Sequence, residues 1–405
     1  PKYLDYIEKT YPEYYSLKYK QQPVTREALQ ERMGAADVLL NYAIVDSFIH
    51  ILLIHKEVIV YKSVATPRPL RKTVQRYIAS LKGENINDFI RYSNVLYKTL
   101  IQPIEKHLDK KFIVIIPDAE LNYLPFELVP TANLSQSFGG ENKLNYNIYK
   151  EVPYLLRKAP ITYNYSATLY LEAKEHDYSN VPEGFMGFAP DFSKVESFAT
   201  SNREKQSKYE DLLLSPLENA AIEVNTIGKM TNGRVYNSFS ATEAIFKAEA
   251  GNYGVLHFAT HGILNHKYPL YSSLVLLGDD TEDGLLHTYE LYNMKLNAEL
   301  VALSACNTGV GTIQKGEGAM SVARGFSYAG CPNIAMTLWP VSDQATQILM
   351  ENFYGNLMRG MPKAEALQKA KLNYHQLQKL LIALWKSLKN VHQSKNRLRH
   401  VFFHV

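Results

Sequence analysis

The sequence predicts an α/β protein whose mostly parallel β-sheet carries helices on both faces. Strand-like runs alternate with helical stretches of roughly ten or more residues along most of the chain, an order typical of such sheets. Two of the runs are short, rich in Val, Leu, Ala and Phe, and bounded by glycine, as strands buried inside a parallel sheet are. No repeat of about 20 to 50 residues is visible.

The composition is that of an ordinary globular protein. Of 405 residues, 46% are hydrophobic and 21% charged, and 44 basic residues against 40 acidic ones leave a net charge of +4. This balance gives no electrostatic reason to expect direct nucleic-acid binding or an anionic membrane as partner. Two cysteines cannot build a disulfide framework, which indicates a reducing compartment and a cytoplasmic location. No apolar run is long enough to span a bilayer, and no signal peptide opens the chain.

Residues 1–25 are rich in Tyr and Lys and are interpreted as a helical stub or linker from an upstream region. Since the chain opens on Pro1 rather than Met, we expect such a region to precede it.

A first α/β block is expected over residues 26–165. The runs 36–47, 48–55 and 57–64 alternate and contain β-branched residues, so they predict an antiparallel meander at a sheet edge. Two helices are predicted next, followed by a buried strand that ends at Asp118. The predicted helices are Pro69–Leu81 and Ile86–Leu108.

The second block, residues 166–405, continues the alternation of strands and helices. The polar stretch Ser193–Glu210 within it is the best candidate for a disordered or cleavable segment. The predicted strands are 159–168 leading into a helix, 184–192, the region of Val235, the run to His261, 272–279, the run to Cys306, and 333–340. The predicted helices are Leu217–Met230, Thr242–Ala250, Gly318–Ala329, Ser342–Met358 with Ser342 as N-cap, and one that begins with Pro362.

A histidine and a cysteine each follow one of the glycine-bounded runs. YGVLHFATHG ends at His261 and Gly262, and ELVALSACNTGVG carries Cys306. Loops at the carboxyl ends of parallel strands are where such sheets place their chemistry, and a Cys with a His can form a nucleophile and its general base. The main-chain N–H groups of Gly262 and Cys306 are the expected oxyanion hole. This arrangement predicts a cysteine protease that needs no cofactor.

The other chemically active side chains have plainer interpretations. His257 lies four residues before His261 on the same face of the strand, but no Cys or carboxylate at suitable spacing completes a metal site. We therefore expect no metal, and a packed strand histidine at His257. Cys331, directly before Pro332, is expected to be structural. Asp118 ends a strand, but its loop offers no partner nucleophile.

Over roughly residues 30–375 the chain resembles the CHAT family, caspase-like cysteine proteases of bacteria related to separase and caspases. LHFATHG is similar to the family's histidine motif and LVALSACNTGVG to its nucleophile motif. The segments 115–129, 216–227, 241–247, 283–296 and 316–370 also resemble family segments.

The resemblance implies a caspase-like fold with His261 as general base, Cys306 as nucleophile and Gly262 in the oxyanion hole. It also implies that residues 26–165 are a catalytically inert caspase-like half packed on the active half. Family members often carry tetratricopeptide repeats upstream, and residues 1–25 would then be the end of such an array. Several act in bacterial antiviral defence, some switched on by a CRISPR-associated ribonucleoprotein, others beside gasdermin-like pore formers. An activating partner bound through the upstream region is thus expected.

Residues 376–405 depart from the family pattern, which ends in a short aromatic strand. Here the tail is helix-like and then basic, and VFFHV at 401–405 is the available replacement for that strand. The basic run Lys386–Arg399 is interpreted as a solvated face rather than a nucleic-acid site.

Four further expectations stay open. A catalytically vestigial scaffold or adaptor with the same fold is the main alternative to a protease, and a transferase domain that uses Cys306 as an acyl carrier is another. Autoprocessing within Ser193–Glu210 would support the protease. The polar, glycine-containing segments Asp279–Gly284 and Gly309–Gly316 are expected to be loops that become ordered on activation.

Overall fold

A computed structural model of the chain describes residues 9, 24–81, 85–109, 112–138, 148–175, 178–192, 214–305, 312–314, 318–338 and 341–374. Two compact units can be distinguished. One comprises residues 1–25 and 168–351, and the other comprises residues 26–167 and 352–405. The functional division at residue 165 stays a prediction.

The unit that contains residues 26–167 is built on a mixed five-stranded sheet with the order β3-β2-β1-β4-β5. β1 (Asp37–Val45), β2 (Phe48–His55) and β3 (Ile59–Ala65) form the predicted antiparallel meander, with β3 at the edge. β4 (Phe112–Ile116) pairs parallel with β1, and β5 (Ile161–Tyr163) pairs parallel with β4. After β4, Asp118 Oδ2 accepts a hydrogen bond from Ile44 N at 2.8 Å, so this carboxylate joins two strand ends.

The helices of this unit are α3 (Arg26–Arg32), α4 (Leu70–Leu81), α5 (Ile86–Leu96), α6 (Leu134–Phe138) and α7 (Ile148–Glu151). Helices α4 to α7 contribute residues to one apolar core that includes the buried faces of β1, β2 and β4, and the short helix α3 precedes β1. The helical stretch predicted over residues 86–108 is helical to His107, but it changes type after Leu96, to a π-helix (Tyr97–Ile101) and then a 3-10 helix (Gln102–His107). Pro103 explains the change, because it has no N–H to donate into an α-helix.

Residues from the other end of the sequence also belong to this unit. The helical residues 363–374 are anchored by two polar contacts: Gln368 Nε2 donates to Leu156 O at 2.7 Å, and Lys371 Nζ lies 3.2 Å from Glu127 Oε1. The C-terminal tail expected to be atypical lies outside the described residues, as does the VFFHV segment.

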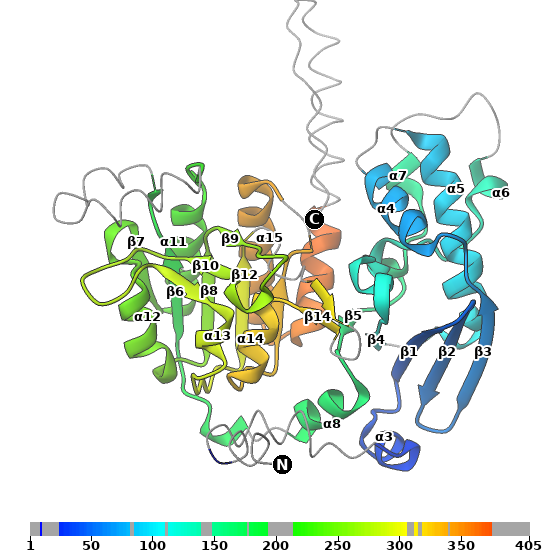
Figure 1. The fold of residues 1–405 in the computed structure, drawn as a ribbon, viewed down its shortest axis with the longest axis horizontal. Helices are drawn as coiled ribbons and strands as arrows, with labels where there is room; N and C mark the ends of the chain where they lie inside the picture. The colour runs from blue at the N-terminus through cyan, green and yellow to red at the C-terminus, as the bar shows by residue number, and fades with distance from the viewer. Residues whose placement is uncertain are drawn as a thin grey trace, which may run out of the picture. The chain divides into compact units, whose positions relative to one another are not determined.

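The other unit is built on a five-stranded sheet with the order β15-β12-β8-β6-β7, shown at the left of Figure 1. All four strand pairings in it are parallel, which confirms the predicted parallel sheet. The strands are β6 (Phe185–Ala189), β7 (Arg234–Asn237), β8 (Val255–Ala259), β12 (Leu300–Ser304) and β15 (Ile334–Met336).

Helices cover both faces of this sheet, as predicted. Leu256 and Phe258 of β8 share one apolar cluster with Phe246 of α12 (Glu243–Glu249) and Phe326 of α14 (Val322–Tyr328). On the opposite face, Ala259 packs with residues of α11 (Ala220–Thr231). The described residues also form helices α8 (Ala167–Glu175), α13 (Thr288–Leu291) and α15 (Asp343–Leu357). The structure therefore has the mixed α/β architecture, with a parallel sheet between helical layers, that the sequence predicts.

Two small antiparallel sheets accompany the main one. β9 (Gly262–Ile263), β10 (Ser273–Val275) and β11 (Leu285–His287) form the first, in the order β11-β10-β9. β13 (Thr312–Gln314) pairs with β14 (Gly318–Met320) to form the second. The helix predicted from Gly318 therefore begins too early. α14 begins only at Val322, because 318–320 pair as a strand and Ser321 then caps the helix by accepting from Arg324 N.

Candidate functional site

The two strands that carry the histidine and cysteine motifs are neighbours. β8 and β12 pair in parallel, and Ala259 is the Cα partner of Ser304 at their carboxyl ends. His261 follows Ala259 by two residues, and Cys306 follows Ser304 by the same interval. Cys306 itself lies outside the described residues, whose last member before it is the buried Ala305.

The imidazole of His261 has a defined partner. Its Nε2 lies 2.7 Å from the main-chain oxygen of Ser215, in the segment that leads into α11. A carbonyl oxygen can only accept, so Nε2 carries the proton and donates it. In the neutral ring the basic nitrogen is then Nδ1, which is the atom available to take a proton from a thiol.

Apolar packing and the main chain also hold His261. The Phe192 ring lies 5.3 Å from the imidazole, measured between centroids. Val275 N donates to His261 O at 2.9 Å, which ties the residue to β10. Gly262 is half-buried, begins β9 and is the Cα partner of Leu274. Its predicted place in an oxyanion hole depends on the main chain at Cys306 and stays a proposal.

His257 is packed inside the protein, as the sequence predicted. Its side chain is fully buried, and Nε2 lies 2.8 Å from Oε1 of Glu223, which is 1% exposed. Sequence reasoning missed Glu223. The available signal was a carboxylate next to Val224 on the apolar side of a predicted helix, where a charged residue needs a partner.

Cys331 is a core residue. It is 1% exposed, and burial raises the pKa of its thiol to about 12. A thiol with this pKa carries almost no thiolate at neutral pH and is a poor nucleophile. The prediction that Cys331 is structural is therefore confirmed.

Among the described residues, one group has three carboxylates close enough to share a metal ion: Glu243, Glu282 and Glu290. The ammonium of Lys247 lies between them, with Nζ 2.8, 2.8 and 2.7 Å from their respective oxygens. Burial disfavours this charge, but the hydrogen bonds to the carboxylates outweigh it and raise the pKa of Lys247. The lysine thus serves as the cation of this cluster.

The segment Asp279–Gly284 is hydrogen-bonded into a turn. Asp279 Oδ1 accepts from the main-chain N–H groups of Thr281 and Glu282 at 2.8 and 3.1 Å. At the other end, Gly284 N donates to Glu243 Oε2 at 2.8 Å. The second expected activation loop, Gly309–Gly316, is described only over residues 312–314, which form β13. Ordering of either segment on activation stays a prediction.

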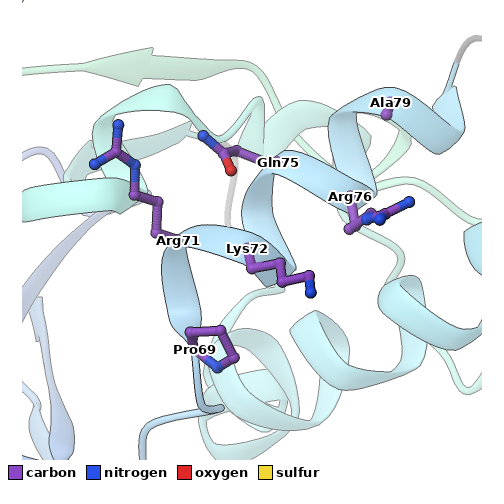
Figure 2. Close-up of a pocket in the computed structure, with 6 residues that line it drawn as sticks. All are labelled: Pro69, Arg71, Lys72, Gln75, Arg76 and Ala79. Atoms are coloured by element: carbon purple, nitrogen blue, oxygen red, sulfur yellow. The ribbon is translucent and has the colours of Figure 1, made fainter.

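A shallow hollow lies beside α4 in the unit that contains residues 26–167. Figure 2 shows its lining, which is Pro69, Arg71, Lys72, Gln75, Arg76 and Ala79. These side chains include cations and an amide but no thiol, imidazole or carboxylate. The hollow therefore lacks a nucleophile and a general base for peptide cleavage.

No helix in the described part of the chain is both long enough and apolar enough to cross a membrane.

Comparison with known proteins points to one family. The sequence model of the CHAT domain matches residues 91–395. The chain is also similar to Tetratricopeptide repeat protein 28 from Mus musculus, with 29% identity over 86 residues, which is 21% of this chain and 4% of that protein. The human protein of the same name is 26% identical over 117 residues, which is 26% of this chain and 5% of that protein. The chain thus matches only a small part of the length of these relatives.

Proposed function

Because the chain belongs to the CHAT domain family, a family of caspase-like cysteine proteases, we propose that it is a cysteine endopeptidase. In this proposal Cys306 is the nucleophile, and His261 is the general base and later the general acid. No metal or organic cofactor takes part.

The observation that carries the proposal is the register of β8 and β12. Ala259 and Ser304 are partners at the carboxyl ends of adjacent parallel strands, and His261 and Cys306 each follow in sequence by two positions, so we propose that their side chains meet at this edge of the sheet. Neighbouring strands are about 4.8 Å apart, a separation that two side chains can close to hydrogen-bond distance. The Ser215 carbonyl supports the same proposal, because a base in such a dyad needs a third group to orient it.

The reaction then runs in two steps, formation of a thioester with Cys306 and hydrolysis of that thioester. Nδ1 of His261 takes the thiol proton, and the Cys306 sulfur attacks the peptide carbonyl carbon while the carbonyl oxygen gains negative charge. The N–H groups of Gly262 and Cys306 stabilise that oxygen. His261 returns the proton to the leaving amine as the C–N bond breaks. Water then attacks the thioester, with His261 as base, and releases the carboxylic acid and the thiol.

We propose a protein substrate and an activating protein or ribonucleoprotein partner that acts through an upstream region, in the cytoplasm. The similarity to two proteins named for tetratricopeptide repeats supports protein partners, because such repeats present extended binding surfaces. A role in bacterial antiviral defence or regulated cell death, linked to a CRISPR effector or a gasdermin, is the biological setting that we propose.

The reactivity of Cys306 tests the dyad without knowledge of the substrate. The chain has two cysteines, and Cys331 is buried, so alkylation of the native protein by iodoacetamide should report on Cys306. We expect the alkylation rate to follow a pH midpoint below the free-thiol value of about 8.5. The midpoint should return to the free-thiol value in His261→Ala, measured by mass spectrometry of the Cys306 peptide.

Proteolysis supplies the second half of the test. Cleavage profiling with a cell extract, with its proposed activator present, should yield fragments that disappear with Cys306→Ala. A Cys306 midpoint that is the same in wild type and His261→Ala would refute the dyad. Identical midpoints together with no cleavage would favour the vestigial scaffold or adaptor.

A further inference from the structure

A buried carboxyl and a buried imidazole join α11 to β8 close to the proposed site. We infer that Glu223 and His257 are positioning residues, whose hydrogen bond sets α11 on the sheet and thereby holds the Ser215 carbonyl against His261. This inference rests on the proposed function. Neither side chain is proposed to touch the substrate.

Burial of this polar pair costs more free energy than burial of apolar side chains of similar size would. Glu223 is 1% exposed and His257 is fully buried, and one hydrogen bond of 2.8 Å joins them. The other carboxylate oxygen of Glu223 is buried without a hydrogen-bond partner among the described residues. Polar groups in such surroundings cost stability, and an apolar pair would pack at least as well. The directional bond is what an apolar pair would not provide.

His257 and His261 both contact the segment that includes Ser215 and α11. Alternate residues of a strand point to the same side, so His257 and Ala259 both face α11. His257 contacts Glu223 in that helix, and Ala259 packs with its apolar side. Two residues further on, His261 contacts Ser215, which precedes the same helix. Residues 257, 259 and 261, in β8 and just after it, therefore each contact the segment 215–224.

The segment that carries the Ser215 carbonyl is fixed to its surroundings. Leu214 and Leu217 pack into separate apolar clusters on either side of Ser215. At the start of α11, the main-chain N and the Nδ2 of Asn219 both donate to Asp343 Oδ2, at 2.6 and 3.0 Å. Ser215 thus leads directly into an anchored helix start, and the Glu223–His257 bond ties that same helix to the strand that leads to His261.

A shift of the carbonyl would change how the imidazole is aimed. A displacement of about 1 Å can cost a factor of a hundred in rate when it misplaces a catalytic group. Loss of the Glu223–His257 bond should therefore weaken proton transfer between Cys306 and His261 even in a folded protein. A purely structural role would lower stability but leave that proton transfer unchanged.

The pH profile of Cys306 alkylation in the full chain separates these two roles. Glu223→Leu removes the bond, and we expect its pH midpoint to move toward that of His261→Ala, with an alkylation rate at neutral pH about tenfold lower. Glu223→Gln keeps an oxygen that accepts from the imidazole and should keep the wild-type midpoint. Val224→Ala is the matched control, because it weakens the packing of the same helix without touching the pair, and its midpoint should also stay wild type.

The possible results are distinguishable. A folded Glu223→Leu protein with the wild-type midpoint would overturn the inference and leave the dyad intact. The same midpoint in wild type and in His261→Ala would overturn the proposed function itself, and the inference with it. If Glu223→Leu fails to fold by circular dichroism, His257→Gln carries the test, and a wild-type midpoint in that variant overturns the inference.

Discussion

The imidazole of His261 is bound by the main-chain carbonyl of Ser215, a residue 46 positions earlier in the sequence, at 2.7 Å from Nε2 to O. The acceptor belongs to the backbone and carries no ionisable group, so it orients the ring without adding a charge that titrates. In the proposed dyad this carbonyl, the partner of Nε2 in the described part of the chain, is the group that selects the tautomer.

We predict that neutral His261 carries its proton on Nε2. Two-bond ¹⁵N–¹H spectra of selectively labelled protein should show a protonated Nε2 and an unprotonated Nδ1 above the titration midpoint. Comparison with His261→Ala assigns the signal. A ring protonated on Nδ1 would contradict the hydrogen bond to Ser215 and the role given to Nδ1.

The Phe192 ring should contribute to the reactivity of Cys306 through its contact with the imidazole. Phe192→Ala removes a buried ring and should cost about 3 kcal/mol of stability. It should also lower the rate of Cys306 alkylation at neutral pH, because the His261 imidazole loses the ring that packs against it. Phe188→Ala is the control, since Phe188 is fully buried in a different apolar cluster, which it shares with Phe246 and Phe258. Equal losses of alkylation rate in both variants would mean that the effect is general destabilisation.

The parallel sheet could be predicted from the sequence because its strands are short apolar runs separated by helices. The strands that precede the His261 and Cys306 motifs are neighbours in this sheet, as expected for two buried strands of one parallel sheet. Local features that depend on one tertiary contact could not be predicted in the same way. The strand at 318–320 exists because it pairs with 312–314, and no local pattern distinguishes it from the first turn of a helix.

The orienting groups around His261 were beyond sequence reasoning for the same reason. Ser215 acts through its backbone carbonyl, which every residue type has, so its side chain gives no signal. Glu223 gives one, as a carboxylate on an apolar helix face, but its partner is 34 residues away. The role assigned to Cys306 still depends on the sequence pattern and on the register of the strand before it.

Close packing of α11 on β6 depends on Gly187. A Cβ at this position would lie 2.6 Å from Cγ1 of Val224, and Gly187 is the strand partner of His257. Gly187→Ala should therefore lift the helix and cost about 1–3 kcal/mol, seen as a lower urea midpoint. Gly251→Ala is a matched control, because its Cβ would meet a single atom, the Lys295 carbonyl oxygen at 3.9 Å. Equal midpoints for the two variants would contradict this account of the packing.

The thiol of Cys331 should react only when the protein unfolds. Burial raises its pKa to about 12 and removes it from solvent. We expect one rapidly modified cysteine in the native protein and two in concentrated urea, counted by intact mass after alkylation. Cys331→Ala should leave the native count at one. A native count of two would show that the core around Cys331 opens on the time scale of the reaction.

The Lys247 cluster gives a prediction with a defined pH dependence. Burial raises the pKa of Glu243 above its usual value, although Lys247 acts against that rise. A folded-state pKa that is raised for an acid means that its contribution to stability is present at low pH and is lost as the pH rises through that pKa. Removal of the ammonium in Lys247→Met removes the opposing effect, so the folded-state pKa of Glu243 should rise further.

Lys247→Met should therefore cost little stability in acid and more at neutral pH. At about pH 8 we expect a loss of about 3 kcal/mol, the cost of leaving a buried charge without its partner; at about pH 5 the loss should be smaller, because the raised pKa of Glu243 favours its protonated form as the pH falls. Urea unfolding at both pH values measures the difference. Lys229→Met, at an exposed position of α11, should show no such dependence. A pH-independent loss in Lys247→Met would mean that the lysine stabilises these elements by packing rather than by charge.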